Sequence, residues 1–263
     1  MSLRLFKFLP MLFATLLCTL AAPAQADALA HIMQTKVLKV AIPTDFPPYG
    51  FVGTTMEPEG LDVDMAKYVA KEMGVKIDLV PASSSNRIPY LQTGKVDLVI
   101  STLGKTAERE KVVDFSHAYS PFFLAVYGPK TMTIKSPADL AGKSISVTRG
   151  SVEDIQMTKV APPSTNIMRF EDNASTIAAF VSGQSQLVAT GVSVASNMMT
   201  HNPGLGAQMK FVLKDSPNFV GVPKGDKALL DKVNAIIDAA KKNGELNKLS
   251  EHWLGRPVGE LPE

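Results

Sequence analysis

The sequence is poor in the residues that usually mark a disulfide scaffold or a metal site. Its single cysteine, Cys18, lies in an N-terminal apolar stretch, so the rest of the chain must rely on a buried core rather than on disulfides. The four histidines, His31, His117, His201 and His252, are scattered without the spacing of metal ligands. The sequence also has no HEXXH, P-loop, GXGXXG or GXSXG motif. We therefore expect no metal and no cofactor.

An excess of charge is lacking as well. The chain has 27 lysines and arginines against 25 aspartates and glutamates, a formal net charge of +2. This balance gives no support to nucleic-acid or polyanion binding. Beyond the N-terminal stretch no apolar run approaches the roughly 20 residues of a membrane-spanning helix, since PFFLAVY at 121–127 is too short.

The first 26 residues have the pattern of a secretory signal peptide. Arg4 and Lys7 form a positive region, an apolar stretch runs over 9–22, and Ala24-Gln25-Ala26 is a cleavage motif. An N-terminal membrane anchor is the alternative, but the apolar stretch is shorter than a span. We predict cleavage before Asp27 and a periplasmic protein of roughly 240 residues, enough for two lobes.

The first half of the mature chain alternates strands and helices. Apolar runs at 37–43, 75–81 and 96–100 read as strands. Between them, 60–74 has apolar residues at helical spacing and 86–94 reads as a helix with proline near its start. This β-α-β-α-β order with short connections is typical of a mostly parallel α/β sheet.

The same alternation begins again at residue 135 and predicts a second α/β lobe. The final amphipathic stretches, 227–244 and 245–255, have no sheet of their own, so we expect them to pack on the first lobe. The chain would then cross between lobes twice, near 121–124 and 215–219, and two crossings form a hinge around a cleft. The predicted division is a signal peptide over 1–26, lobe 1 over 36–121, lobe 2 over 123–215, and lobe 1 again over 217–263.

One arginine stands where a cation is disfavoured. Thr106 can cap a helix that begins after it, which places Arg109 in the first turn, at the positive end of the macrodipole. The cost is about 0.3–1 kcal/mol. Either Glu108 and Glu110 compensate Arg109 as a solvated ion pair, or Arg109 and the free N–H groups bind an anion together.

Small polar residues gather where the predicted strands end. Ligands of open α/β sheets bind beyond the carboxyl ends of the strands, although turn and cap chemistry also explains such residues. Gly150 to Glu153 opens a second helix N-terminus, so a carboxylate held by both lobes would favour a closed state. The strand-end segments are 44–46, 83–85, 101–104, 148–151 and 189–191.

Several blocks resemble the family 3 solute-binding proteins, the periplasmic receptors of polar amino acid ABC importers. They are FPPYGF, GLDVDMAKYVAKEMG, IPYLQTGKVDLVISTLGKTAEREKVVDFSHAYSPF, LAGKSISVTRGS and NGELNKLSEHWLG. The resemblance covers essentially the whole mature chain in order. It implies the type II, Venus-flytrap periplasmic-binding-protein fold, a monomer without enzymatic activity, and an inner-membrane permease as partner.

The resemblance also implies a ligand site. In the family the arginine of the ER pair clamps the ligand α-carboxylate, which corresponds to Arg109. An aromatic residue covers the ligand side chain, which corresponds to Phe46. The remaining implied contacts are Ser101, Thr102 and position 104 in lobe 1, and Thr148, Ser151 and the backbone N–H of Val152 in lobe 2.

Three positions depart from the family pattern. Gly104 lacks the usual hydroxyl, and Ser84 replaces a large side chain. Gly191 stands where the family places the aspartate that pairs with the ligand ammonium, and an ammonium buried without an anion costs several kcal/mol. Either a nearby carboxylate such as Asp45 replaces this aspartate, or the ligand is a D-amino acid or a carboxylate without an α-amine.

The leading hypothesis is a receptor for an amino acid or small carboxylate. No acidic residue is evident among the implied contacts, which favours a small neutral ligand over arginine or lysine. The alternative is an enzyme on the same fold, of the cyclohexadienyl or arogenate dehydratase type, with Asp45, Glu153 or Asp172 as general acid. A receptor that signals to a membrane sensor is a third interpretation, which the sequence does not separate from transport.

Overall fold

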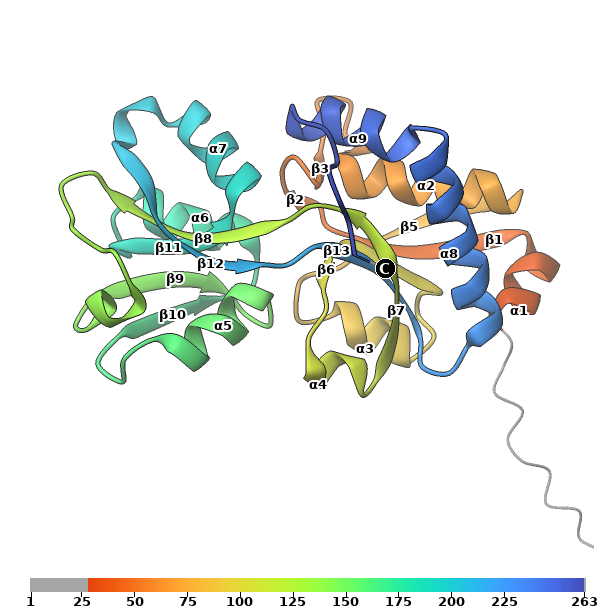
Figure 1. Cartoon of the computed structure of the whole chain (residues 1–263), viewed down its shortest axis with the longest axis horizontal. Coiled ribbons are helices and arrows are strands. Elements are labelled where there is room, and N and C mark those ends of the chain that lie inside the picture. Colours follow the sequence, from red (N-terminus) through yellow and green to blue (C-terminus); the bar gives the residue numbers. More distant parts are fainter. Residues whose placement is uncertain (1–27, 263) are drawn as a thin grey trace, which may run out of the picture.

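The computed structural model describes residues 28–262, so the predicted signal peptide lies outside the described residues. The chain forms two α/β lobes, each built around a five-stranded sheet (Figure 1). Among the described residues no helix is long and apolar enough to cross a membrane.

Lobe 1 contains the first sheet, with strand order β5-β1-β6-β13-β7. Apolar side chains of α2, α8 and α9 pack in one core cluster with β1 and β6, and α3 packs in a separate cluster. The elements are α1 (Ala28–Thr35), β1 (Val37–Ile42), α2 (Leu61–Met73), β5 (Lys76–Pro81), α3 (Arg87–Gln92), β6 (Leu98–Gly104), α4 (Ala107–Glu110), β7 (Val113–Ser120), β13 (Asn218–Pro223), α8 (Lys227–Lys242) and α9 (Glu245–Leu254). A small sheet of β2 (Asp45–Phe46), β3 (Gly50–Val52) and β4 (Pro58–Glu59) adjoins them.

Lobe 2 contains the second sheet, with strand order β10-β9-β11-β8-β12. Its elements are β8 (Phe123–Pro129), η1 (Pro137–Leu140), β9 (Ser144–Thr148), α5 (Val152–Val160), β10 (Asn166–Phe170), α6 (Asn173–Val181), β11 (Leu187–Gly191), α7 (Val192–His201), η2 (Pro203–Leu205) and β12 (Ala207–Asp215).

The sheets are mixed, where the sequence predicted a mostly parallel arrangement. β1 pairs in parallel with β5 and β6, but β13 runs antiparallel to both β6 and β7. In lobe 2, β8 is likewise antiparallel to β11 and β12. The reason is connectivity: a strand that enters a lobe from the other lobe arrives at the carboxyl ends of the parallel strands and must run against them. The stretch at 28–35, where no helix was predicted, forms α1 with Ile32 fully buried.

Two segments connect the lobes. One links β7 to β8 through Phe122, and the other links β12 to β13 through Ser216. The Ser216 N–H donates to the Phe122 carbonyl at 2.9 Å, so the two crossings are hydrogen-bonded to each other. Figure 1 shows them side by side between the lobes.

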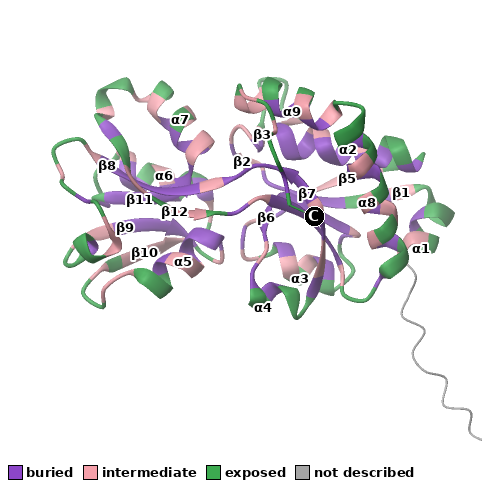
Figure 2. Ribbon diagram, in the orientation of Figure 1, coloured by how far each residue is buried: buried purple, intermediate pink, exposed green. Residues whose placement is uncertain are grey.

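Burial follows the periodicity of the sequence. In Figure 2 the central strands of both sheets are mostly buried, the edge strands β5, β10 and β12 are mostly intermediate or exposed, and the outer faces of the helices are exposed. In α8 the buried positions are Leu229, Val233, Ile236, Ile237 and Ala240, the apolar stripe of an amphipathic helix. Each large apolar side chain buried in this way contributes about 1.5–3 kcal/mol. The helix predicted over 227–244 is therefore confirmed and packs on lobe 1 as expected.

Candidate functional site

A small cavity lies between the lobes, next to the hinge. Its volume is about 10 Å³, room for about one water molecule, so a ligand can enter only if the lobes separate. Wider surface grooves of about 370 to 420 Å³ lie elsewhere. Two of them are lined by lysines, one by Lys241 and Lys242 and the other by Lys67 and Lys71, and neither has a buried charged side chain in its lining. The cavity is lined by Phe46, Ser84, Arg87, Thr102 and Phe122, and from lobe 2 by Ser151, Val152, Glu153 and Asn173.

Arg109 connects the lobes beneath this cavity. The Thr106 side chain caps α4 by accepting from the Arg109 N–H at 3.2 Å, as predicted. The Arg109 side chain is only 6% exposed, and its Nη1 and Nη2 donate to the carbonyls of Gly104 in lobe 1 and Gly150 in lobe 2, at 2.7 and 2.9 Å. These bonds use two of the five donors of the guanidinium.

Arg109 forms no ion pair with Glu108 or Glu110, the two acids that could have compensated it. Glu108 pairs with Lys159 across the lobes at 3.4 Å, and Glu110 lies 4.0 Å from Lys105. Burial, together with the nearby charge of Arg87, lowers the pKa of Arg109 to about 10, which still leaves it charged at neutral pH. A buried cation in a helix's first turn that forms no ion pair with a carboxylate of residues 28–262 is the arrangement expected of an anion site.

Arg87 is a cavity residue that the sequence reasoning missed. It is 4% exposed, lines the cavity, and its Nε has no hydrogen-bond partner among the described residues. Burial lowers the pKa of Arg87, and the charges of Asp62 and Glu153 oppose that effect. Arg87 begins α3, the next element along the chain after β5, so it stands in a helix's first turn after a strand, as Arg109 does. A search of the sequence for cations in the first turns of predicted helices would have found it.

Glu153 provides a negative charge from lobe 2. It is 6% exposed, lies in the first turn of α5 and lines the cavity. Burial raises the pKa of Glu153. Hydrogen bonds from its own backbone N–H and from Ser151, and the charges of Arg87 and Arg109, oppose that rise. Glu153 was expected only as a general acid of the enzyme alternative.

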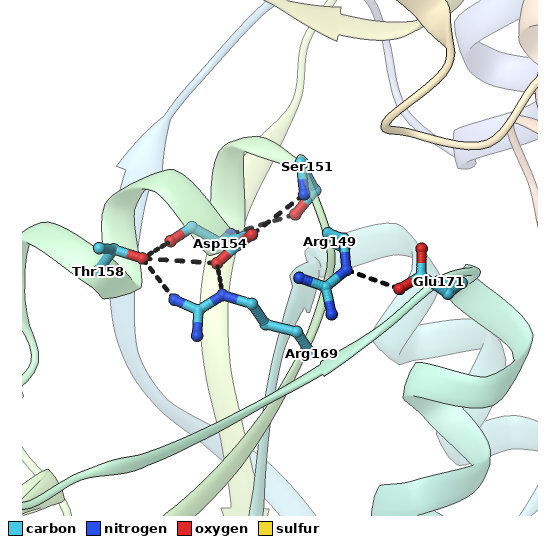
Figure 3. A network of polar contacts seen from close by, with 7 residues as sticks. Arg149, Ser151, Asp154, Thr158, Arg169 and Glu171 are labelled. Atoms are coloured by element: carbon cyan, nitrogen blue, oxygen red, sulfur yellow. Dashed lines mark hydrogen bonds and ion pairs between the residues drawn. The ribbon is translucent and has the colours of Figure 1, made fainter.

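A polar network fixes the start of α5. The Ser151 hydroxyl accepts from the Asp154 N–H at 3.1 Å, and the Asp154 carboxylate accepts from Gly150 N–H at 3.0 Å and from Arg169 Nε at 2.7 Å. Figure 3 shows this network, with Arg169 also donating to Thr158. The turn that bears Ser151 and Val152 is therefore held in place before any ligand contacts it.

Thr102 adopts an unusual backbone conformation that a buried aspartate supports. Its φ is 43°, rare for a residue with a side chain. Its N–H donates to Asp62 Oδ2 at 2.7 Å, while the Tyr119 hydroxyl donates to Asp62 Oδ1 at 2.7 Å. Asp62 is fully buried, and burial raises its pKa to about 7. Asp62 thus shapes the lobe 1 wall of the cavity from behind.

Asp45 contacts lobe 2 rather than the cavity. Its Oδ2 accepts from the N–H groups of Asn173 and Ala174 at 2.7 and 3.1 Å, and its Oδ1 accepts from Asn173 Nδ2 at 3.0 Å. The carboxylate of lobe 1 therefore caps the N-terminus of α6 in lobe 2. Both of its oxygens are engaged, so Asp45 does not stand free to meet an ammonium.

Thr148 lies behind the cavity in lobe 2. Its hydroxyl is hydrogen-bonded to Asn173 Oδ1 and to the Thr176 hydroxyl, both at 2.9 Å. The Asn173 amide is therefore fixed between Thr148 and Asp45. In lobe 1, Ser101 is fully buried and its hydroxyl has no partner among the described residues.

The two glycines that depart from the family pattern stand at close contacts. A Cβ at Gly191 would lie 2.5 Å from the Phe122 ring. A Cβ at Gly104 would lie 2.4 Å from the Ser216 hydroxyl and 2.9 Å from Val152, across the lobes. In this closed arrangement the hinge ring of Phe122 occupies the space that an aspartate at 191 would need.

The structure thus brings some of the predicted residues to the cavity wall and leaves others around it. Among the described residues no group of three or more histidine, cysteine, aspartate and glutamate side chains could hold a metal ion. Those on the wall are Phe46, Ser84, Thr102, Ser151 and Val152; those around it are Asp45, Ser101, Gly104, Arg109, Thr148 and Gly191.

Comparisons with known proteins support the predicted resemblance to the solute-binding proteins. The family model of the bacterial extracellular solute-binding proteins, family 3, matches residues 38–256. The ABC transporter glutamine-binding protein GlnH of Bacillus subtilis (strain 168) is 29% identical over 242 residues, which cover 90% of this chain and 88% of that protein.

Solved structures share the two-lobed fold. An ancestral arginine-binding protein bound to arginine matches with a TM-score of 0.80 at 34% identity, covering 84% of this chain and 99% of that one. AncCDT-1, an ancestral amino acid-binding protein and precursor of cyclohexadienyl dehydratase, matches with a TM-score of 0.77 at 33% identity, covering 86% and 98%. The fold and family expected from the sequence motifs are confirmed. The chain belongs to the bacterial extracellular solute-binding proteins, family 3.

Proposed function

We propose that this protein is the periplasmic receptor of an ABC importer and binds a small neutral amino acid, of L or D configuration, or a related small carboxylate. The observation that carries the proposal is the pair of buried arginines, Arg87 and Arg109, at a cavity that the two lobes close together. Cations buried without hydrogen-bonded carboxylate partners suit a ligand carboxylate. The ligand would contact both lobes and so favour closure.

The charges around the cavity support a ligand without net charge. The buried charges here are the cations Arg87 and Arg109 and the acids Glu153 and Asp62, so this buried cluster is close to neutral when both acids are ionised. Asp45 and Glu108 also act on the arginines, but they are partly or fully exposed, where solvent screens them. A zwitterion leaves this balance unchanged, whereas a lysine-like ligand would add a cation beside two others. The rings of Phe46 and Phe122, 6.2 Å apart, add an apolar wall for a short side chain.

The test begins with a melting-temperature screen of the chain from Asp27 onward against L- and D-amino acids and small carboxylates. A ligand at a hundred times its Kd adds about 2.7 kcal/mol of stability and raises the melting temperature by several degrees. For the ligand found, Arg109→Ala should weaken binding by about 2–5 kcal/mol in calorimetry. The control is Arg149→Ala, an exposed arginine in lobe 2 that pairs with Glu171. Equal affinities of the two variants would refute the clamp.

A dehydratase on the same fold is the second candidate, because Glu153 is a buried acid whose pKa is raised. The other expected acids, Asp45 and Asp172, accept hydrogen bonds from backbone N–H groups of α6. Incubation with arogenate or prephenate, followed by absorbance of the aromatic product, tests it directly. Recovery of the substrate unchanged would exclude the dehydratase and favour the receptor. Deleting the neighbouring permease would then distinguish transport from signalling through a membrane partner.

A further inference from the structure

The lobe 2 aspartate that would receive a ligand ammonium is absent, and the structure shows that it has no room in this arrangement. Gly191 ends β11 against the Phe122 ring, which lies within 2.6 Å of where a Cβ would be. An ammonium buried in the closed cavity without an anion costs several kcal/mol. Another carboxylate must therefore receive it if the ligand is an amino acid.

Among the described residues, the carboxylates whose charges act on the cavity residue Arg87 are Asp45, Asp62 and Glu153, and the first two are held by groups outside the cavity. Asp45 caps α6 with both oxygens. Asp62 accepts from Thr102 N–H and the Tyr119 hydroxyl with one oxygen each, behind the cavity wall. Neither lines the cavity.

Glu153 is the carboxylate that does line the cavity. It comes from lobe 2, opposite the two arginines of lobe 1, and it is 6% exposed. Its carboxylate accepts hydrogen bonds from its own backbone N–H and from Ser151, and the charges of Arg87 and Arg109 act on it from lobe 1. Figure 3 shows the Asp154 network that fixes the start of α5, the helix whose first turn carries Glu153.

From this geometry we infer that Glu153 accepts the α-ammonium of the ligand, in place of the missing aspartate. The inference rests on the proposed function. The arginines of lobe 1 hold the carboxylate of the amino acid, and Glu153 of lobe 2 holds its amine. The bound ligand then contacts the arginines and Glu153 directly, where without ligand these groups attract one another only at longer range. Only the closed state brings the arginines and Glu153 to the same ligand.

The experiment distinguishes the contribution of the ligand amine to binding from that of the ligand carboxylate. The probes are amino acids that raise the melting temperature, each paired with the same acid lacking the amine, such as alanine with propionate and glutamine with its deaminated acid. Calorimetry then compares the parent protein with Glu153→Gln, which keeps the size of the side chain and removes its charge. Glu171→Gln is the control, because Glu171 is an exposed lobe 2 glutamate whose side chain is 70% exposed.

We expect Glu153→Gln to weaken binding of the amino acid by about tenfold or more, since the lost contact is to a charged group. Binding of the deaminated acid should be nearly unchanged. Glu171→Gln should change neither. Melting temperatures without ligand check that the variant is folded, and Glu153→Asp, which restores the charge, should recover part of the preference for the amine.

Two results would overturn the inference about Glu153 without contradicting the proposed receptor function. One is a parent protein that binds the deaminated acid as tightly as the amino acid, and the other is a Glu153→Gln variant that weakens both probes equally or neither. Binding of no amino acid and no carboxylate by the parent protein would overturn the proposed function and the inference together.

Discussion

Replacing Asp45 with alanine should weaken ligand binding although this side chain does not line the cavity. Its carboxylate accepts three hydrogen bonds from α6 of lobe 2, at 2.7, 3.0 and 3.1 Å. These bonds join β2 of lobe 1 to lobe 2, so they exist only when the lobes are closed. The substitution therefore removes stability from the closed state and leaves each lobe intact.

The size of the effect follows from these contacts. A hydrogen bond to a charged group contributes about 1.5–3 kcal/mol, and loss of a helix N-cap costs about 0.5–2 kcal/mol. Since Asp45 is partly exposed, solvent screening reduces the sum, and we expect the closed state to lose about 1–3 kcal/mol. That corresponds to a dissociation constant about 5 to 150 times larger.

The assay is stopped-flow and calorimetric binding of the ligand found in the screen, with small-angle scattering to measure closure. Because the bonds form after the ligand has entered one lobe, the dissociation rate should rise and the association rate should change little. The matched control is Glu108→Ala, which breaks another contact across the lobes, the exposed pair with Lys159. We expect no measurable change from it, since exposed ion pairs contribute little.

The reasoning would be refuted by an Asp45→Ala variant that binds and closes like the parent protein. A variant with a lower association rate and an unchanged dissociation rate would also contradict it, because Asp45 would then act on the open state or on the ligand directly.

Two further predictions concern residues behind the cavity. Gly191→Ala should lower the free energy of unfolding by about 1–3 kcal/mol in denaturant titration, because the Phe122 ring must move, and an unchanged midpoint would show that the ring moves freely. Burial raises the pKa of Asp62 to about 7, above its value of about 3.9 in an unfolded chain, so its contribution to stability is complete below about pH 4 and is lost as the pH rises through 7, by at most about 1.4 kcal/mol per unit. Asp62→Asn should flatten this slope in unfolding measured between pH 4 and 8, and an equal slope in both proteins would place the titration elsewhere.

The sequence by itself determined the elements and the class of site. Periodicity located α2 and α8, and α2 ends at Gly74, which adopts the left-handed conformation that glycine favours. Thr106 and the apolar run before it predicted a helix whose first turn carries Arg109, and the structure has that helix. These features are local, because hydrogen bonds within one turn and the alternation of apolar residues decide them.

The tertiary structure alone decided which charges meet. Glu153 faces Arg87 and Arg109 from another lobe, and Asp45 reaches α6 across 128 positions of sequence. Such pairings depend on the hinge and on the direction in which each strand enters its sheet, which no spacing in the sequence encodes. The sequence could therefore indicate that a carboxylate replaces the aspartate missing at Gly191. The proposal that this carboxylate is Glu153 depends on the packing of Phe122 against that glycine and on the hydrogen bonds that Asp45 and Asp62 make elsewhere.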